Sequence, residues 1–183
     1  MKNVVLIGFM GTGKTSVGKI LAGKLGFAFA DIDKKIEEEY SMTIADMFIN
    51  KGESYFRSVE QQMVKRLAAR KNTVIATGGG AVANAENMKA LRENGLIVCL
   101  KANVDSIKAR TEGNDNRPLL MALTDEERTK KIEELLATRA EFYEQADYTV
   151  DTSELSPMQV ADDIARFCLK NKNRRKTNSN ENS

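Results

Sequence analysis

Residues 4–26 constrain the fold of this 183-residue chain more than any other segment. The apolar run Val4–Gly8 precedes a glycine-rich turn, and an amphipathic helical pattern then extends from about Lys14 to Leu25. The turn, Gly8-Phe-Met-Gly-Thr-Gly-Lys-Thr15, fits G-x-x-x-x-G-K-[ST] at every fixed position. A strand that enters a helix through such a turn is typical of α/β folds, so we expect a parallel sheet.

Four more short apolar runs follow, and helical patterns separate them. Strands that are connected through helices give a parallel sheet with helices on both faces. The sequence therefore predicts a single three-layer α/β domain over 1–169 with a five-stranded parallel sheet. Within it, Asn84 is a candidate helix cap, and Thr124-Asp-Glu-Glu127 is a capping box. The later strands are expected at 27–30, 73–77, 96–100 and 148–150, and the later helices at 34–40, 44–50, 54–69, 84–95, 103–111, 124–143 and 158–169.

The composition excludes several kinds of active site. The chain has no histidine and only two cysteines, so a Ser-His-Asp triad, a Cys-His pair and a histidine-ligated zinc site are ruled out. The chemistry must use carboxylates, lysine, arginine, hydroxyls and backbone amides, a set that suits phosphate. No apolar run approaches the roughly eighteen residues of a membrane span, and no targeting segment is recognisable. We therefore expect a cytoplasmic protein without membrane contact.

The formal net charge of +2 conceals a basic end. In 170–183 five basic residues stand against Glu181, which leaves the segment at +4 and the rest of the chain at −2. The segment has no apolar residue and cannot bury surface, so we expect 170–183 to be a disordered basic tail. A solvated terminus explains it better than nucleic-acid binding does.

The glycine-rich turn is expected to bind a nucleoside triphosphate. Glycines let the backbone wrap around a phosphate with successive N–H groups pointing inward, and the following helix adds the positive end of its dipole. Lys14 should then reach the β- and γ-phosphates, and the Thr15 hydroxyl should coordinate Mg²⁺. The remaining nucleotide-binding candidates of this segment are Gly11, Thr12, Gly13 and Ser16.

Two aspartates follow the strand expected at 27–30. Alternation along an extended chain places Asp31 and Asp33 on the same side, about 7 Å apart. One could serve the metal through water while the other faces a substrate hydroxyl; the alternative is a helix cap with a solvated neighbour. The strand at 73–77 ends in Gly78-Gly79-Gly80, where many P-loop proteins have an aspartate. Because ligands bind beyond the carboxyl ends of parallel strands, these strand ends are expected to share one crevice.

Three arginines are candidate anion ligands. Arg57 and Arg139 lie in helical patterns, and Arg117 lies in the polar segment 112–123. Arginine is suited to bidentate capture of carboxylates and phosphates, but each of the three, taken singly, is more readily explained as a surface charge. Spacing alone leaves both alternatives open.

From Asn3 to Leu169 the chain resembles the shikimate kinase family. The motifs agree with that family in order and separation, and their combination is far more specific than the phosphate loop alone. The segments that carry the resemblance are Gly8–Thr15, Asp31-Ile-Asp33, Ile44-Ala-Asp-Met-Phe48, Gly52-Glu53, Phe56-Arg57 with Glu60, Gly78-Gly-Gly-Ala81, Arg117-Pro-Leu-Leu120 and Arg139 with Tyr143.

The resemblance implies a nucleoside-monophosphate-kinase-like fold with a helical substrate-binding region near 32–60 and a mobile lid near 112–123. It also implies Mg²⁺-dependent transfer of the γ-phosphoryl group of ATP to the 3-hydroxyl of shikimate. We further expect a monomer. Asp33 would hold the ring hydroxyls and could act as the base. Phe48 and Phe56 would lie against the ring of shikimate. Its carboxylate would be held by Arg57, Arg139 and the triple glycine Gly78, Gly79 and Gly80, chiefly through the Gly79 amide.

The same resemblance assigns residues to the nucleotide. Asp31 would support Mg²⁺ through water, and Arg110 would lie against adenine. Arg117 would swing in with the lid to meet the transferring phosphate, beside Lys14. The chain departs from the family in 151–157, where a basic residue is often found, so the adenine contacts there are expected from the backbone and Pro157.

Two alternatives remain at this point. Another small-molecule P-loop kinase, such as a gluconate kinase, would share the phosphate loop but does not specially require Arg57, Asp33 and Gly79 together. Nucleoside monophosphate kinases are weaker rivals because no pocket for a second base is evident. The other alternative is a nucleotide-binding regulatory module without catalysis that binds RNA or a protein through its tail.

Overall fold

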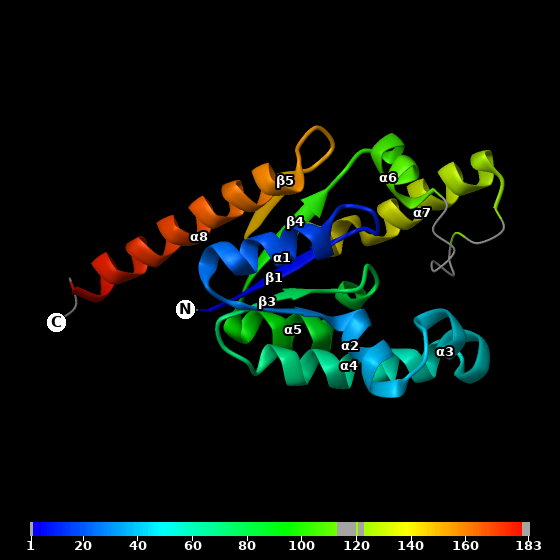
Figure 1. Ribbon diagram of the computed structural model, residues 1–183, viewed down its shortest axis with the longest axis horizontal. Coiled ribbons are helices and arrows are strands. Elements are labelled where there is room, and N and C mark those ends of the chain that lie inside the picture. The colour runs from blue at the N-terminus through cyan, green and yellow to red at the C-terminus, as the bar shows by residue number, and fades with distance from the viewer. Residues whose placement is uncertain (1, 113–119, 121–122, 181–183) are drawn as a thin grey trace.

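The computed structural model describes residues 2–112, 120 and 123–180, and only the backbone of 172–180. The described strands form one parallel sheet in the order β2-β3-β1-β4-β5, which confirms the predicted fold class (Figure 1). The predicted lid at 112–123, including Arg117, lies almost wholly outside the described residues. The strands are β1 (Asn3–Gly8), β2 (Ala28–Asp31), β3 (Thr73–Ala76), β4 (Gly95–Lys101) and β5 (Tyr148–Asp151).

The strand order places the phosphate loop at the centre of the sheet. The chain leaves β1 for β2 and β3 on one side, and then crosses to β4 and β5 on the other side. β1 is therefore flanked by β3 and β4, and the connection after β1 runs toward β2 whereas the connection after β4 runs the opposite way, toward β5. A crevice opens at such a point beyond the carboxyl ends of the strands. The glycine-rich turn after Gly8 stands there.

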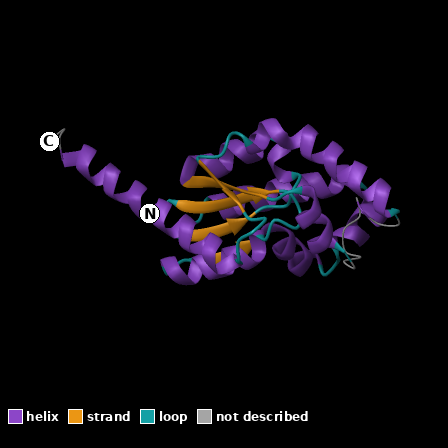
Figure 2. Ribbon diagram, turned by 90° about the horizontal axis from the view of Figure 1, so that it is seen from above, coloured by secondary structure: helices purple, strands orange, loops and turns teal. Residues whose placement is uncertain are grey.

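The sheet lies between two layers of helices (Figure 2), and alternating residues of the strands pack against one layer or the other. Val4, Leu6 and Val74 belong to an apolar cluster with residues of α1 and α8, whereas Val5 and Ile75 pack in a second cluster with residues of α2, α4, α5 and α7. Both faces of the sheet are thus covered, as the parallel arrangement requires. The helices are α1 (Lys14–Leu25), α2 (Ile32–Tyr40), α3 (Ile44–Lys51), α4 (Glu53–Ala68), the 3₁₀ turn η1 (Ala81–Ala83), α5 (Ala85–Asn94), α6 (Val104–Thr111), α7 (Asp125–Tyr143) and α8 (Pro157–Asn180).

Local capping signals begin the helices where the sequence indicated. Thr124 and Glu127 form the reciprocal capping box of α7, and the Asn84 side chain accepts two backbone N–H groups at the start of α5. The helix ends where the sequence predicted, since Gly95 is its C-cap, and Gly95 is also the first residue of β4. It has an extended backbone, so the helix ends at Asn94 and the chain enters the sheet directly.

Two helices differ from their predicted bounds by more than one residue. α2 begins at Ile32, because the Asp31 carboxylate accepts the Lys34 N–H and caps the helix. α8 continues to Asn180, through most of the segment for which we expected no structure, and extends beyond the sheet (Figure 1). No glycine or proline interrupts 158–180, so nothing in the backbone chemistry stops the helix. Despite this length, no helix of the described residues is both long and apolar enough to cross a membrane.

Two glycines inside α1 are expected to respond oppositely to alanine. A Cβ at Gly18 would lie 2.5 Å from the Phe29 ring and 3.3 Å from Leu6, whereas a Cβ at Gly23 would meet no described atom within 4 Å apart from its chain neighbours and the backbone of its own helix. Alanine favours a helix interior over glycine by about 1 kcal/mol, but overpacking a core costs about 1–3 kcal/mol. We expect Gly23→Ala to raise the free energy of unfolding by up to about 1 kcal/mol, and Gly18→Ala to lower it by about 1–2 kcal/mol.

Urea unfolding of both variants measures the difference, and each variant serves as the matched control for the other. Equal stabilisation by the two substitutions would show that α1 does not pack tightly against β2.

Candidate active site

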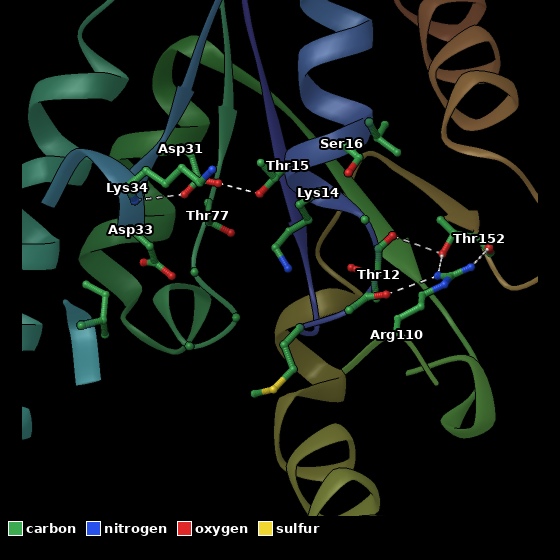
Figure 3. Close-up of a pocket in the computed structure, with 18 of the residues that line it drawn as sticks. Thr12, Lys14, Thr15, Ser16, Asp31, Asp33, Lys34, Thr77, Arg110 and Thr152 are labelled. Carbon is green, nitrogen blue, oxygen red and sulfur yellow. Dashed lines mark hydrogen bonds between the residues drawn. The ribbon is translucent and has the colours of Figure 1, made fainter. Parts of the chain in front are cut away.

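The carboxyl ends of β1, β2 and β3 open into a cleft of about 650 Å³ (Figure 3). Every described residue that we expected at the site lines this cleft; Arg117 lies outside the described residues. The expected residues that the fold brings together here are Gly11, Thr12, Gly13, Lys14, Thr15, Ser16, Asp31, Asp33, Phe48, Phe56, Arg57, Gly78, Gly79, Gly80, Arg110 and Arg139.

The phosphate loop is shaped by its glycines. Gly11 and Gly13 have φ angles of 76° and 93°, in the left-handed region that other residues rarely adopt. The Lys14 ammonium lies inside the loop and donates to the carbonyls of Gly8 at 2.7 Å and Phe9 at 2.8 Å. None of the described side chains caps α1, so its first N–H groups are available to an anion.

Thr15 and Asp31 form one oxygen-rich corner of the cleft. The Thr15 hydroxyl donates to Asp31 Oδ2 at 2.6 Å, while Asp31 Oδ1 accepts the Lys34 N–H at 3.3 Å and so caps α2 (Figure 3). The helix-cap alternative that the sequence left open is therefore realised at Asp31. Asp33 reaches the cleft as expected, but the predicted extended conformation of 31–33 is wrong. The strand ends at Asp31, and Asp33 lies in the first turn of α2.

Asp33 is the most perturbed acid of the cleft. Burial raises its pKa to about 7, and the negative charges of Asp31 and Glu60 contribute to the rise, against the opposing charge of Lys14. Its Oδ1 atom is buried and has no hydrogen-bond partner among the described residues. A buried acceptor without a partner is costly, so this oxygen is suited to a hydrogen bond from a ligand.

Two arginines line the same cleft as Asp33. Arg57 Nη1 donates to Glu60 Oε2 at 2.8 Å, and Arg139 is buried with its Nη1 atom unpartnered among the described residues. The alternative of a surface charge is therefore wrong for Arg139. Glu60, only 1% exposed, was not among the predicted site residues, although its place three residues after Arg57 was a signal that the two could pair.

The triple glycine leaves room for these charged groups. A Cβ at Gly78 would lie 2.8 Å from Asp33 Oδ1, one at Gly79 3.1 Å from Arg139 Nη1, and one at Gly80 2.8 Å from Arg57 Nη2. The backbone of 78–80 thus lies directly against all three side chains. Tyr143 fixes it by donating from its hydroxyl to the Gly79 carbonyl at 3.1 Å.

The other end of the cleft is lined by Arg110, Thr152, Leu155 and Pro157. Arg110 donates to Thr152 and to the Gly11 carbonyl of the phosphate loop. Pro157 lies at this end, where we expected it. Thr152 was missed, and no motif in the sequence marked it.

A phosphate loop after β1, a buried carboxylate and two arginines on one cleft define a P-loop kinase that acts on a small anionic acceptor. A comparison with protein families agrees, since the family model described as shikimate kinase matches residues 10–169. The chain belongs to the shikimate kinase family and is an ATP-dependent kinase.

Individual relatives cover nearly the whole chain. It is 51% identical over 166 residues to a shikimate kinase of Thermodesulfovibrio yellowstonii, an alignment that covers 91% of this chain and 94% of the relative. It is 45% identical to a shikimate kinase of Persephonella marina, over 90% and 97% of the two chains. Among solved structures it resembles the shikimate kinase of Acinetobacter baumannii in complex with shikimate, with a TM-score of 0.89 and 38% identity over 94% of this chain and 95% of that one.

The raised pKa of Asp33 predicts a stability that falls as pH rises. The folded protein holds the Asp33 proton up to about pH 7, whereas an unfolded aspartate loses it near pH 4. Between these values the folded state binds more protons, so the free energy of unfolding decreases with increasing pH. An asparagine side chain cannot ionise, so we expect Asp33→Asn to raise Tm relative to wild type at pH 8, and by clearly less at pH 5.

Calorimetry at the two pH values measures this difference. Asp105→Asn, which removes an exposed carboxylate from the first turn of α6, controls for the loss of one negative charge. A Tm difference for Asp33→Asn that is the same at pH 5 and pH 8 would contradict the assigned burial.

Proposed function

We propose that this protein transfers the γ-phosphoryl group of ATP to the 3-hydroxyl of shikimate, giving shikimate 3-phosphate and ADP. The observation that supports it best is the pair of buried, unpartnered atoms among the described residues of the cleft, Asp33 Oδ1 and Arg139 Nη1. An acceptor that carries both hydroxyls and a carboxylate satisfies both atoms. The A. baumannii relative, whose structure is in complex with shikimate, supports the same acceptor.

The acceptor binds between α2, α4, α7 and the triple glycine. Arg57, Arg139 and the Gly79 amide hold its carboxylate, because guanidinium groups pair bidentately with carboxylates. Glu60 fixes the Arg57 guanidinium through its hydrogen bond to Nη1. The ring lies against Phe48 and Phe56, whose own rings are 4.9 Å apart between centres.

The phosphates of ATP bind in the loop after β1. Lys14 leaves the carbonyls of Gly8 and Phe9 to reach the β- and γ-phosphates, while the N–H groups of Gly11, Thr12 and Gly13 and the start of α1 surround them. Ser16 lies at the same helix start and contacts the nucleotide.

The Thr15–Asp31 corner fits Mg²⁺. It offers one hydroxyl and one carboxylate, and Mg²⁺ bound to nucleotides keeps several waters and takes only one or two protein oxygens. Among the described residues no three or more acidic or cysteine side chains are placed so that they could hold a metal ion together, and none are needed for such a metal. When bound there, Mg²⁺ would neutralise charge on the phosphate oxygens. Thr15 would contact it directly and Asp31 through water.

Asp33 accepts the hydrogen bond of the 3-hydroxyl and orients its oxygen toward the γ-phosphorus. As the new O–P bond forms, the bond from phosphorus to the β–γ bridging oxygen breaks, ADP leaves, and the hydroxyl proton passes to the Asp33 carboxylate. Lys14 and Arg117 stabilise the charge that develops on the transferring group. The lid that carries Arg117 excludes water, which would otherwise compete as acceptor. We also propose that the protein is a monomer and that it is located in the cytoplasm.

The direct test is Mg²⁺-dependent ADP release with shikimate, compared with gluconate, AMP and no acceptor. We expect turnover with shikimate alone and a loss of at least about 100-fold in kcat/KM in Asp33→Asn, because a positioned base contributes that much or more. ADP release that does not depend on shikimate would mean that the acceptor is wrong while the nucleotide site is right.

Gly80→Ala separates the carboxylate site from the rest of the cleft. The backbone of Gly80, with φ −97° and ψ −8°, suits alanine, so the substitution acts only through its Cβ, which displaces the Arg57 guanidinium. We expect KM for shikimate to rise about tenfold, the value of one charge-assisted hydrogen bond, with KM for ATP unchanged.

Initial-rate kinetics with each substrate varied in turn give both constants, and Gly23→Ala is the control for a distant glycine. An unchanged KM for shikimate in Gly80→Ala would remove Arg57 from the carboxylate site.

A further inference from the structure

We infer that Thr152 is a positioning residue for nucleotide binding, which holds the Arg110 guanidinium in place at the adenine end of the cleft. The inference rests on the proposed function, because it takes this end of the cleft as the site of the base. Thr152 is only 2% exposed and follows the last residue of β5. It lies beside Arg110 and Thr12 (Figure 3).

Thr152 presents two acceptors to one guanidinium. Arg110 Nη1 donates to the Thr152 hydroxyl at 3.0 Å, and Arg110 Nη2 donates to the Thr152 carbonyl at 2.6 Å. Arginine's planar fork matches two acceptors held at a fixed separation, so this pairing sets the plane of the group as well as its position. Arg110 Nη1 also contacts the Gly11 carbonyl at 3.3 Å, which links the arginine to the phosphate loop.

The hydroxyl of Thr152 is fixed from its other side. A hydroxyl has one proton to donate and can accept as well, and here it accepts from Arg110. Its own proton faces the carbonyls of Lys101 at 2.9 Å and Thr12 at 3.2 Å. Thr152 therefore joins the ends of β4 and β5, the phosphate loop and Arg110 at a single buried atom.

The surrounding loop holds Thr152 itself in place. The Thr152 N–H donates to the Lys101 carbonyl at 2.8 Å. The next residue, Ser153, donates to the Asp151 carboxylate at 2.6 Å and accepts the Asn103 N–H at 2.9 Å. Asn103 caps α6, the helix that carries Arg110, so both partners of the pair belong to one hydrogen-bonded frame.

This frame explains how an exposed arginine can bind the adenine base of a nucleotide. An arginine that is free to rotate loses side-chain entropy when it packs against a ligand, whereas one that is already held loses little. The loop 151–157 brings no basic side chain of its own, so Arg110 is the cation available to the base among the described cleft residues at this end.

Thr152→Val keeps the shape of the side chain and removes the hydroxyl. We expect KM for ATP to rise about tenfold, the value of one charge-assisted hydrogen bond, while kcat and KM for shikimate change by less than about twofold. Thr152→Ser retains the hydroxyl and should restore KM for ATP to within about twofold of wild type. Thr73→Val is the matched control, since Thr73 is an equally buried threonine whose hydroxyl bonds a carbonyl, at the start of β3 and away from the cleft.

A double-mutant cycle with Arg110→Ala tests whether Thr152 acts through Arg110. If it does, Thr152→Val adds less than about twofold to KM for ATP once Arg110 is alanine. Full additivity, or an equal rise of KM in the valine and serine variants, would overturn the inference and leave a structural role only. Arg110→Lys supplies a second test on an unaltered Thr152, because lysine cannot bridge both acceptors, and it should reproduce the rise in KM.

Binding of ADP, measured by titration calorimetry without acceptor, separates this inference from the proposed function. Wild type that binds ADP but shows no shikimate-dependent turnover would refute the acceptor and leave the Thr152 comparison intact. Equal ADP affinity in wild type, Thr152→Val and Arg110→Lys would refute the role of Thr152, whatever the acceptor is.

Discussion

The close approach of the backbone at Gly78–Gly80 to three charged side chains is the constraint on which the acceptor end of the cleft depends. Asp33, Arg139 and Arg57 come from three different helices, and each lies within about 3 Å of where a Cβ of this segment would stand. A side chain at any of these positions would push the corresponding charge away. Only glycines at these positions leave room for the three charged side chains, and the Tyr143 hydroxyl holds the glycine backbone by donating to the Gly79 carbonyl.

Gathering these charges in a buried place has an energetic cost that the cleft only partly offsets. Arg57 pairs with Glu60, yet burial still raises the pKa of Glu60, and the pKa of Asp33 rises to about 7. Two buried polar atoms of the cleft, on Asp33 and Arg139, have no partner among the described residues. Such a site is destabilised without a ligand, and under the proposed function it would regain hydrogen bonds when a hydroxylated carboxylate binds, so that stability is lost in exchange for affinity.

The sequence predicted the fold and the phosphate loop because both rest on local patterns, whereas Arg57, Arg139 and Arg110 were assigned to the cleft only by the resemblance to a known family. The five strands, the capping box at Thr124 and the loop that ends in Lys14 each follow from short-range spacing. Asp33 was placed correctly at the cleft but for the wrong local reason, because capping by Asp31 starts α2 earlier than its apolar pattern shows. Thr152 could not be found, since its partners Lys101, Thr12 and Arg110 are 42 to 140 residues away and no short motif records such contacts.

The two ends of the cleft are built by different elements and meet at the phosphate loop. The proposed acceptor end uses α2, α4, α7 and the segment after β3, whereas the proposed nucleotide end uses α6 and the loop after β5. The loop touches both: the Gly11 carbonyl accepts from Arg110, and the backbone of Gly8 and Met10 lies within 4 Å of where a Cβ of Gly79 would stand. Phosphoryl transfer requires the donor and acceptor oxygens to lie in line with one phosphorus atom, so one rigid loop at the central strand can set both distances. The position of β1 between β3 and β4 would thus set the geometry of the proposed transfer.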